Sequence, residues 1–577
     1  MLGQKSLHIE NPWKSWSTSW RGSDDCRIRR SRVAVRGVEC NFAAERLNKE
    51  WVLAIDVGTG GTKAALISAR GNVSASAFAP HPAPAATVEG GPASMEQDQD
   101  SWWLATKNAV WSCLGSTEAV ARGISVAQVC AVAVTGQMQD VILLPGPGSH
   151  KRCNAILYSD ARAQSEAAEI AELGGGSDLV ASITGFPQGA SSVLAKLRWL
   201  DKRDPKSAHG CRSLLLGGHD YVVWKLCGLC VTDATTASTT GLTNATFQYA
   251  EDLLEKVELG HWIDKLPTIV ASNSPCGELS SQAAVELGCA ALQGVPVIHC
   301  CGDAGACTLG AGAGERGTTY AYLGTSGWVA GSFAKKSSRD KGSEVKLSGV
   351  YTLAHPDPSL VFKTGSIMTA GGNLAWAASN LVAPSGAIDM KELDALVKSV
   401  PAGSGGLLYL PYLNGERCPF EDPHARASFV GISAVTTRGH LLRSVMEGVA
   451  FAMRSARDAM FADQLPEDLS RPLYLVGGGA RSPVWPAIMA AVFGQTVDVL
   501  EDAQEVGVKG AALLAGQWLG WQCGHENWVQ VKNSFSPSTE DIELYEELFA
   551  TYSQAYFGLK HVHQRLSNFQ KSSRIGN

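Results

Sequence analysis

The sequence lacks the features that would place it in the simplest functional classes. No uninterrupted apolar run approaches the roughly 20 residues that a membrane-spanning helix requires, so we expect no membrane-embedded function. Acidic residues outnumber basic ones by 55 to 49, and the net charge of −6 gives no basic surface for nucleic acid. The 15 cysteines are scattered, and the pairs Cys227/Cys230 and Cys300/Cys301 lack a second pair or a histidine at zinc-ligand spacing. This indicates a reducing compartment with mostly buried thiols.

The first segment of the chain differs in composition from the rest. A chain of 577 residues with 45% hydrophobic content predicts two large globular domains or roughly three to four smaller ones. Residues 1–37 carry a net charge of +5, which leaves −11 for the remainder. Five arginines lie from Cys26 to Arg36 with no acid among them, and no apolar signal segment is present. The segment resembles a transit peptide for a chloroplast or another organelle; a disordered extension on a cytoplasmic protein is the alternative.

Three short apolar strands are each followed by a loop of glycine, threonine or serine. The loops are Asp56–Gly61 after the strand Trp51–Ile55, Gly324–Gly327 after Thr318–Leu323, and Gly477–Ser482 after Leu473–Val476. Small residues let backbone N–H groups approach phosphate oxygens, and hydroxyl groups add further donors. One such loop is weak evidence, because glycine turns between strands are common. Three loops, together with an aspartate at two strand ends, favour a nucleotide triphosphate site.

The two strand-end aspartates suit phosphoryl transfer. Asp56 precedes a predicted phosphate loop, where a carboxylate can hold Mg²⁺ directly or through water. Asp303 follows the apolar strand Val295–Cys300, where it can take a proton from an attacking hydroxyl; the alternative is that it only caps the next helix. Because the strand–turn–strand pattern occurs twice, we expect two similar α/β domains that face each other across a cleft.

Together with several further segments, these loops resemble the FGGY family of carbohydrate kinases, most closely its xylulokinases. The segments that carry the resemblance are Ile55–Lys63, Met95–Asp98 with Trp102 and Trp103, Gly136–Met138, Ala155–Asp160 with Arg162, Lys196–Trp199, Asp220 and Tyr221, Thr232 and Asp233, Gly324–Gly327, Leu410–Arg417 with Pro419, Ala427 through Gly431 to Glu447, Gly477–Ser482, and Gly507 to Gly510. The resemblance begins near Trp51 and covers nearly all of the chain after it.

The resemblance implies an α/β protein with a two-domain actin/hexokinase-like (ribonuclease H-like) fold. ATP and Mg²⁺ would lie between the domains. The expected division is an extension at residues 1–50, a sugar-binding domain at 51–292, a nucleotide-binding domain at 293–566 and a tail at 567–577. The expected partners are a small sugar and ATP, without nucleic acid or membrane, in a monomer or homodimer.

The resemblance also assigns roles to individual residues. Asp303 would be the catalytic base, and Asp56 and Asp303 would hold Mg²⁺. ATP and its phosphates would contact Gly58, Thr59, Gly60, Thr62, Lys63, Gly324, Thr325, Gly478, Gly479 and Ala480. The sugar would contact Gln137, Met138, Gln139 and Asp303. His219, His299 and His424 have no metal-ligand companions in the sequence, so we expect them to be structural.

The implied activity is ATP-dependent phosphorylation of a terminal hydroxyl of a ketose, with D-xylulose as the first candidate. Xylulokinases usually have Met-His-Gly where this chain has Met138, Gln139 and Asp140, and that histidine contacts the sugar. They also often have asparagine at Ala304. Since a lost hydrogen-bond partner can change sugar selectivity, ribulose, sedoheptulose and a glycerol-type polyol are alternatives. A catalytically inactive, nucleotide-binding regulatory protein is a further alternative, against which the presence of both aspartates argues.

Overall fold

The computed structural model describes residues 50–86, 94–146, 153–335, 349–382, 389–462, 471–524 and 528–574. The predicted transit peptide lies in the extension at residues 1–50, of which the structure describes only Glu50. The described segments belong to one compact unit that starts at Lys49. Among them, no helix combines the length and the apolar character needed to cross a membrane.

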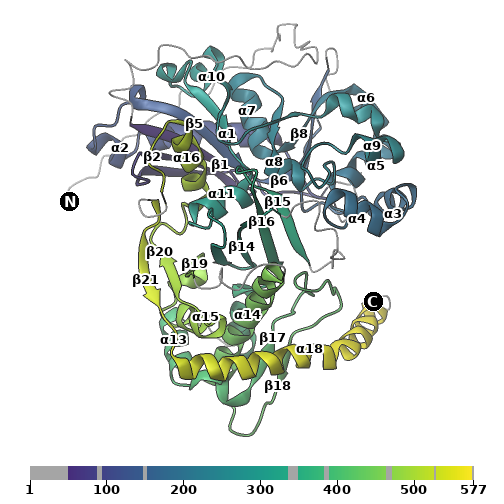
Figure 1. Ribbon diagram of the computed structural model, residues 1–577, viewed down its shortest axis with the longest axis vertical. Coiled ribbons are helices and arrows are strands. Elements are labelled where there is room, and N and C mark those ends of the chain that lie inside the picture. Colours follow the sequence, from purple (N-terminus) through teal and green to yellow (C-terminus); the bar gives the residue numbers. More distant parts are fainter. Residues whose placement is uncertain are drawn as a thin grey trace, which may run out of the picture. The chain divides into compact units, whose positions relative to one another are not determined.

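A six-stranded sheet forms the centre of the first half of the chain. Its order is β11-β12-β5-β1-β2-β3. Figure 1 labels β1, β2 and β5 of this sheet. The strands are β1 (Trp51–Val57), β2 (Gly61–Ser68), β3 (Val73–Pro80), β5 (Val129–Gly136), β11 (Pro275–Glu278) and β12 (Pro296–His299). Every residue of β5 is buried, as expected for a central strand covered on both faces. The first sheet includes β12 and therefore extends past the predicted division at residue 292.

A seven-stranded sheet forms the centre of the second half, in the order β15-β16-β14-β13-β19-β20-β21. Its strands are β13 (Thr319–Leu323), β14 (Gly327–Ala334), β15 (Val350–Ala354), β16 (Leu360–Ile367), β19 (Leu473–Val476), β20 (Val497–Leu500) and β21 (Val531–Phe535). Five of them, β16-β14-β13-β19-β20, repeat the order and the parallel or antiparallel sense of β3-β2-β1-β5-β12. The predicted pair of similar α/β units is thus present.

The other elements of the first half cover its sheet and add a smaller one. A four-stranded sheet has the order β4-β7-β6-β8, and β9 pairs with β10. These elements are β4 (Glu96–Gln97), α1 (Gln99–Leu114), α2 (Thr117–Ala121), β6 (Met138–Pro145), β7 (Ala155–Ile156), α3 (Gln164–Leu173), α4 (Ser177–Thr184), α5 (Val193–Arg203), α6 (Pro205–Gly210), β8 (Cys211–Gly217), α7 (Gly218–Cys227), β9 (Val231–Asp233), α8 (Ala234–Ser238), α9 (Glu251–Lys256), η3 (Gly260–Lys265), β10 (Thr268–Val270) and α10 (Ser281–Glu286).

The second half is mostly helical outside its sheet. Its further elements are α11 (Asp303–Gly310), α12 (Gly371–Ala377), α13 (Met390–Lys398), β17 (Leu408–Leu410), β18 (Ser428–Val430), α14 (Arg438–Phe461), η8 (Gly478–Arg481), α15 (Trp485–Phe493), α16 (Val506–Trp518) and α18 (Thr539–Arg574). The predicted C-terminal amphipathic helix corresponds to α18, which buries Tyr545, Tyr552 and Tyr556 in the second core.

The helices α11 and α16 join the two halves. They cross so closely that a Cβ on Gly310 would lie 1.9 Å from the carbonyl oxygen of Val506, and one on Gly510 would lie 1.8 Å from that of Ala306. Side chains of α16 share one apolar cluster with β1, β5 and β12 of the first sheet. As a result, a helix that lies in the chain between β20 and β21 of the second sheet starts beside the carboxyl end of β1.

Candidate active site

Three predicted site residues of the first half lie at or just after the ends of three neighbouring strands. β1, β5 and β12 run parallel, with Val57 opposite Gly136 and His299 opposite Val134. Their carboxyl ends therefore meet at one edge of the sheet, where ligands of open α/β sheets bind. Asp56, Gln137 and Asp303 come from these strand ends.

Asp56 and Asp303 form a pair of interacting carboxylates. Burial and the negative charge of Asp56 raise the pKa of Asp303 to about 7. Burial also raises the pKa of Asp56, and the charge of Lys63 opposes that shift. The N-cap of α11 is Gly302, so Asp303 is the first helical residue and is not needed as a cap. Two repelling carboxylates are arranged to share a proton or to hold a divalent cation.

Gln137 and Met138 connect the segments that carry the two aspartates. The backbone N–H of Gln137 donates to the Val57 carbonyl at 2.9 Å, next to Asp56. Met138 packs against Gly302, where a Cβ would lie 2.2 Å from its Sδ. The structure thus brings two of the predicted sugar-binding residues, Gln137 and Met138, together with the carboxylate pair.

Gln139 follows Met138 in β6, and its side chain is hydrogen-bonded to another part of the protein. Its backbone has a φ of 65°, a left-handed conformation that non-glycine residues rarely adopt. Its Nε2 donates to the carbonyl oxygen of Thr239 at 2.9 Å. One donor of this side chain is therefore already used.

The first glycine loop connects β1 with β2. The Gly58 N–H donates to the Gly61 carbonyl at 3.1 Å, and the Thr59 hydroxyl lies 3.3 Å from the hydroxyl of Tyr158. Lys63 Nζ pairs with Glu505 Oε1 at 3.3 Å, ahead of α16. Tyr158 was not among the predicted site residues.

Thr62 differs from its neighbours in the predicted phosphate loop. It is a fully buried residue of β2, and its Oγ1 has no partner among the described residues. Thr62 therefore belongs to the buried part of β2 that follows the loop.

The other two glycine loops lie side by side at the edge of the second sheet. They follow β13 and β19, which are parallel neighbours. Gly477 has a φ of 99°, and a Cβ there would lie 2.7 Å from the Leu323 carbonyl oxygen, so only glycine fits. Gly324 is held by the Gly371 N–H, which donates to its carbonyl at 2.8 Å. Thr325 and Gly478 are exposed, Gly479 is half-buried, and Ala480 is buried.

Comparison with known families decides what kind of protein carries this site. The N-terminal domain of the FGGY family of carbohydrate kinases matches residues 51–310, and its C-terminal domain matches residues 319–518. The chain belongs to the FGGY family of carbohydrate kinases. It is therefore a sugar kinase, an enzyme that transfers a phosphoryl group to a carbohydrate hydroxyl.

Curated relatives of this kinase are named as sugar kinases. It is 27% identical over 534 residues to a xylulose kinase of Bacillus subtilis, which covers 91% of this chain and all of that protein. It is also 27% identical over 485 residues to an L-xylulose/3-keto-L-gulonate kinase of Escherichia coli, covering 82% of this chain and 91% of that protein.

Solved structures confirm the expected two-domain actin/hexokinase-like fold. A xylulose kinase from Rhodospirillum rubrum is 28% identical and superposes with a TM-score of 0.77, over 89% of this chain and 99% of that one. A Plasmodium falciparum glycerol kinase solved with ADP is 20% identical with a TM-score of 0.74, over 88% and 97%, and shows likeness of fold.

The kinase also has a fully buried cluster of His219, Asp220, Asp233 and His299. The sequence shows no metal-ligand companions for the two histidines, but α7, β9 and β12 bring two aspartates to them. His299 Nε2 lies 2.8 Å from Asp220 Oδ1, shorter than the spacing of about 3.3 Å between ligands of a tetrahedral metal ion. Burial would raise the pKa of Asp233, but the hydrogen bond and charge of His219 lower it to about 2. The cluster is therefore a hydrogen-bonded ion network.

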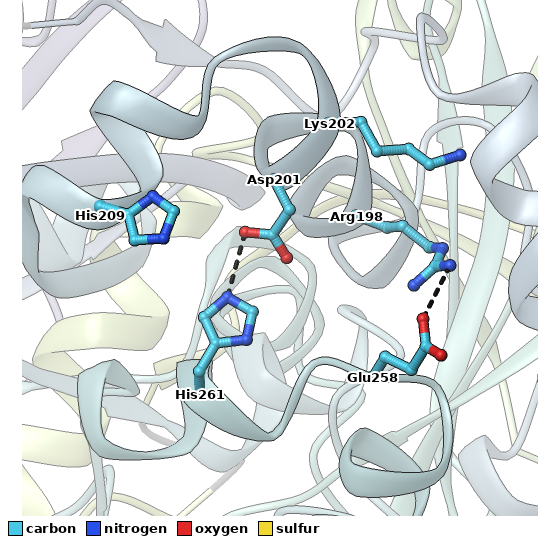
Figure 2. A pocket seen from close by; sticks show the side chains of 6 residues that line it. All are labelled: Arg198, Asp201, Lys202, His209, Glu258 and His261. Carbon is cyan, nitrogen blue, oxygen red and sulfur yellow. Dashed lines mark hydrogen bonds and ion pairs between the residues drawn. The ribbon is translucent and has the colours of Figure 1, made fainter.

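A cavity of about 400 Å³ lies elsewhere in the kinase, among α5, α6 and η3 (Figure 2). Its lining residues are Arg198, Asp201, Lys202, His209, Glu258 and His261. His261 pairs with Asp201 at 3.1 Å and Arg198 with Glu258 at 3.2 Å. None of the predicted site residues lines this cavity.

Proposed function

We propose that this kinase uses ATP with Mg²⁺ to phosphorylate the terminal hydroxyl of a ketopentose, with D-xylulose as the first candidate. The observation that carries the proposal is the carboxylate pair Asp56 and Asp303 beside Gln137 and Met138. The names of the relatives support the sugar class, and the glycine loops support a nucleotide.

The residues present fit a divalent cation and a nucleotide. Asp56 and Asp303 offer hard oxygen ligands, and a cation offsets the burial and the negative charge of Asp56 that together raise the pKa of Asp303. When bound, MgATP supplies the phosphoryl group that is transferred. The loops around Gly324 and Gly478 offer backbone N–H groups to the nucleotide, and Thr59 offers a hydroxyl to the phosphates.

Asp303 acts as the general base in this proposal. Its carboxylate would take the proton from the terminal hydroxyl of the sugar as that oxygen attacks the terminal phosphoryl group of ATP and ADP leaves. A base with a pKa of about 7 suits this task, because it is ionised in a large fraction of molecules at neutral pH and still accepts a proton readily. Gln137 and Met138 orient the sugar toward this base.

D-Ribulose is a second candidate, because two residues of this chain differ from the usual xylulokinase residues. Xylulose and ribulose differ only in the configuration at C3, so one hydrogen-bonding side chain in the pocket can discriminate between them. Gln139 stands where xylulokinases usually have a histidine, and its amide nitrogen is used by Thr239. Ala304, where those kinases often have asparagine, offers no side-chain hydrogen bond.

A coupled assay of ADP release over ketoses and polyols tests the proposal. We expect kcat/KM for the preferred ketopentose to exceed that for glycerol by about 10²-fold or more, since a hydroxyl-binding pocket discriminates strongly. ADP release without sugar is the background control. Higher kcat/KM for ribulose than for xylulose would select the second candidate. No sugar-dependent release with any ketose or polyol would overturn the proposal and favour the regulatory protein.

The pH dependence of the reaction follows from the pKa of Asp303. The pKa of about 7 lies above the ordinary value of 3.8, so the carboxyl group gains a proton as the pH falls through 7. We expect kcat/KM for the sugar to be flat above this value and to fall about tenfold per pH unit below it. Higher Mg²⁺ should move the midpoint to lower pH, because a cation favours the ionised carboxylate. A midpoint independent of Mg²⁺ would contradict this assignment.

A further inference from the structure

Asp140 is a fully buried carboxylate next to the sugar-binding strand segment, and none of the predicted roles uses it. It stands where the resembled kinases usually have glycine. Its Oδ2 accepts a hydrogen bond from Gln137 Nε2 at 2.9 Å, and its Oδ1 accepts one from the Tyr158 N–H at 3.1 Å. One carboxylate thus holds Gln137 and the residue whose hydroxyl lies 3.3 Å from Thr59.

These contacts fix the orientation of the Gln137 amide. If the amide turned over, its Oε1 would face a carboxylate oxygen, and two acceptors would repel each other. Burial raises the pKa of Asp140 to about 7, and the opposing influences are the charge of buried Lys196 and the donors at Tyr158 and Gln137. Both oxygens face donors, which is the arrangement of an ionised carboxylate.

The fixed orientation leaves one acceptor unused. Gln137 Oε1 is buried and has no hydrogen-bond partner among the described residues. The backbone of Gln137 is held at 2.9 Å by the Val57 carbonyl and at 3.0 Å by the Gly218 N–H, so the residue has little freedom to relieve this. A buried acceptor without a donor is unfavourable, and a ligand that brings a hydroxyl removes the penalty. Oε1 is closed to solvent in this structure, so a ligand that binds there requires the site to open, as substrate admission does in kinases.

We propose that Asp140 is a positioning residue for sugar selectivity: it turns the Gln137 amide so that Oε1 is kept as an acceptor for one sugar hydroxyl. The inference rests on the proposed function, because it takes the ligand beside Gln137 to be the sugar. It adds that the sugar must offer a hydroxyl donor to Gln137 Oε1. The carboxylate that imposes this requirement, Asp140, is usually absent from the resembled kinases. Lys196, whose Nζ donates to the Leu157 carbonyl at 2.7 Å, offsets the charge of Asp140.

The first test is Asp140→Asn in the full chain. Asparagine has one side-chain oxygen, which still accepts the hydrogen bond from the Tyr158 N–H. Its amide nitrogen therefore faces Gln137. Gln137 must then turn over and present a donor where it had an acceptor. We expect the Kd of the sugar, measured by calorimetry without nucleotide, to rise about ten- to a hundredfold, with the KM for ATP unchanged within about twofold.

Two double variants separate positioning from simple charge balance. In Gln137→Glu/Asp140→Asn, the asparagine nitrogen donates to one oxygen of the glutamate, and the other oxygen restores the acceptor; we expect the sugar Kd to return to within about threefold of wild type. In Asp140→Asn/Lys196→Met both buried charges are removed but the acceptor is not restored, so the weak sugar binding should persist. Recovery in the second double variant and none in the first would overturn the inference in favour of charge balance.

The control is Asp201→Asn, which alters a carboxylate of the same half that contacts His261 (Figure 2). The same carboxylate contacts Trp262, and in the described part of the chain no hydrogen bond joins it to Gln137. It should leave the sugar Kd unchanged. If Asp140→Asn fails to fold, as judged by its melting curve, Gln137→Glu/Asp140→Asn decides alone, because it retains one buried negative charge; a tenfold rise in its sugar Kd would overturn the inference.

The same experiment distinguishes the two proposals. Sugar-dependent ADP release by the wild-type chain tests the proposed function. The change in sugar Kd among variants tests the role of Asp140. An unchanged Kd in folded Asp140→Asn, with a wild-type enzyme that turns over the sugar, overturns only the inference.

Discussion

Asp303→Asn is expected to reduce sugar-dependent ADP release by on the order of 10³-fold, the contribution of a well-placed general base. Asparagine has nearly the same shape as aspartate but cannot take the proton from the attacking hydroxyl. The nucleotide should still bind, because the loops around Gly324 and Gly478 belong to the second sheet and do not depend on this side chain. The measurement is kcat from coupled ADP release, with ADP affinity from calorimetry.

The variant should not lose stability. The raised pKa of Asp303 means that its ionised form is disfavoured in the folded chain relative to the unfolded chain. That cost grows as the pH rises above the ordinary pKa of 3.8 and is complete above about 7, so replacing the group with a neutral amide should raise Tm at pH 8 and change it little at pH 4. Turnover within tenfold of wild type would contradict the role as base. Lost ADP affinity or a lowered Tm at pH 8 would instead indicate a structural defect.

The sequence predicts the parts of this site that depend on neighbouring residues. An apolar strand followed by glycine and threonine is a local pattern, and β1 with its loop, β13 with Gly324, and β19 with Gly477 were found in this way. Two such units also predicted the two similar sheets. These predictions hold because strand length, turn residues and burial are all encoded over a few positions.

The parts that could not be predicted depend on contacts between distant segments. The division at residue 292 left β12 outside the first sheet, since the pairing of Val297 with Val132 joins strands far apart in the chain. Asp140 was noted only as a departure from the resembled pattern, and its bond to Gln137 depends on the side-chain conformations at the start of β6. A charged residue points to a special role when it is buried, and the burial of Asp140 is known only from the structure.

Gly507 shows how much such a distant contact contributes. It is the second residue of α16, and a Cβ there would lie 2.3 Å from Asp56 Oδ2. The sequence shows the glycine pair Gly507 and Gly510. It does not reveal that Gly507 leaves space for the carboxylate of Asp56. Asp56 is short and sits at the end of a buried strand, so it must shift if a methyl group is added.

Gly507→Ala is therefore expected to lower kcat by about 10²-fold, because small displacements of a group that positions the reacting atoms cost that much. The apparent affinity for Mg²⁺ should fall as well, since Asp56 is a proposed ligand. Stability should move less than activity: alanine favours a helix by about 1 kcal/mol over glycine, which offsets part of the steric strain. The matched control is Gly558→Ala in α18, where no atom lies within 4 Å of the added Cβ. Wild-type kcat and Mg²⁺ dependence in Gly507→Ala would show that the exact position of Asp56 is not required, whereas a loss in both variants would point to helix stability. A loss confined to Gly507→Ala would tie the start of α16, and through it the second sheet, to the carboxylate pair of the first.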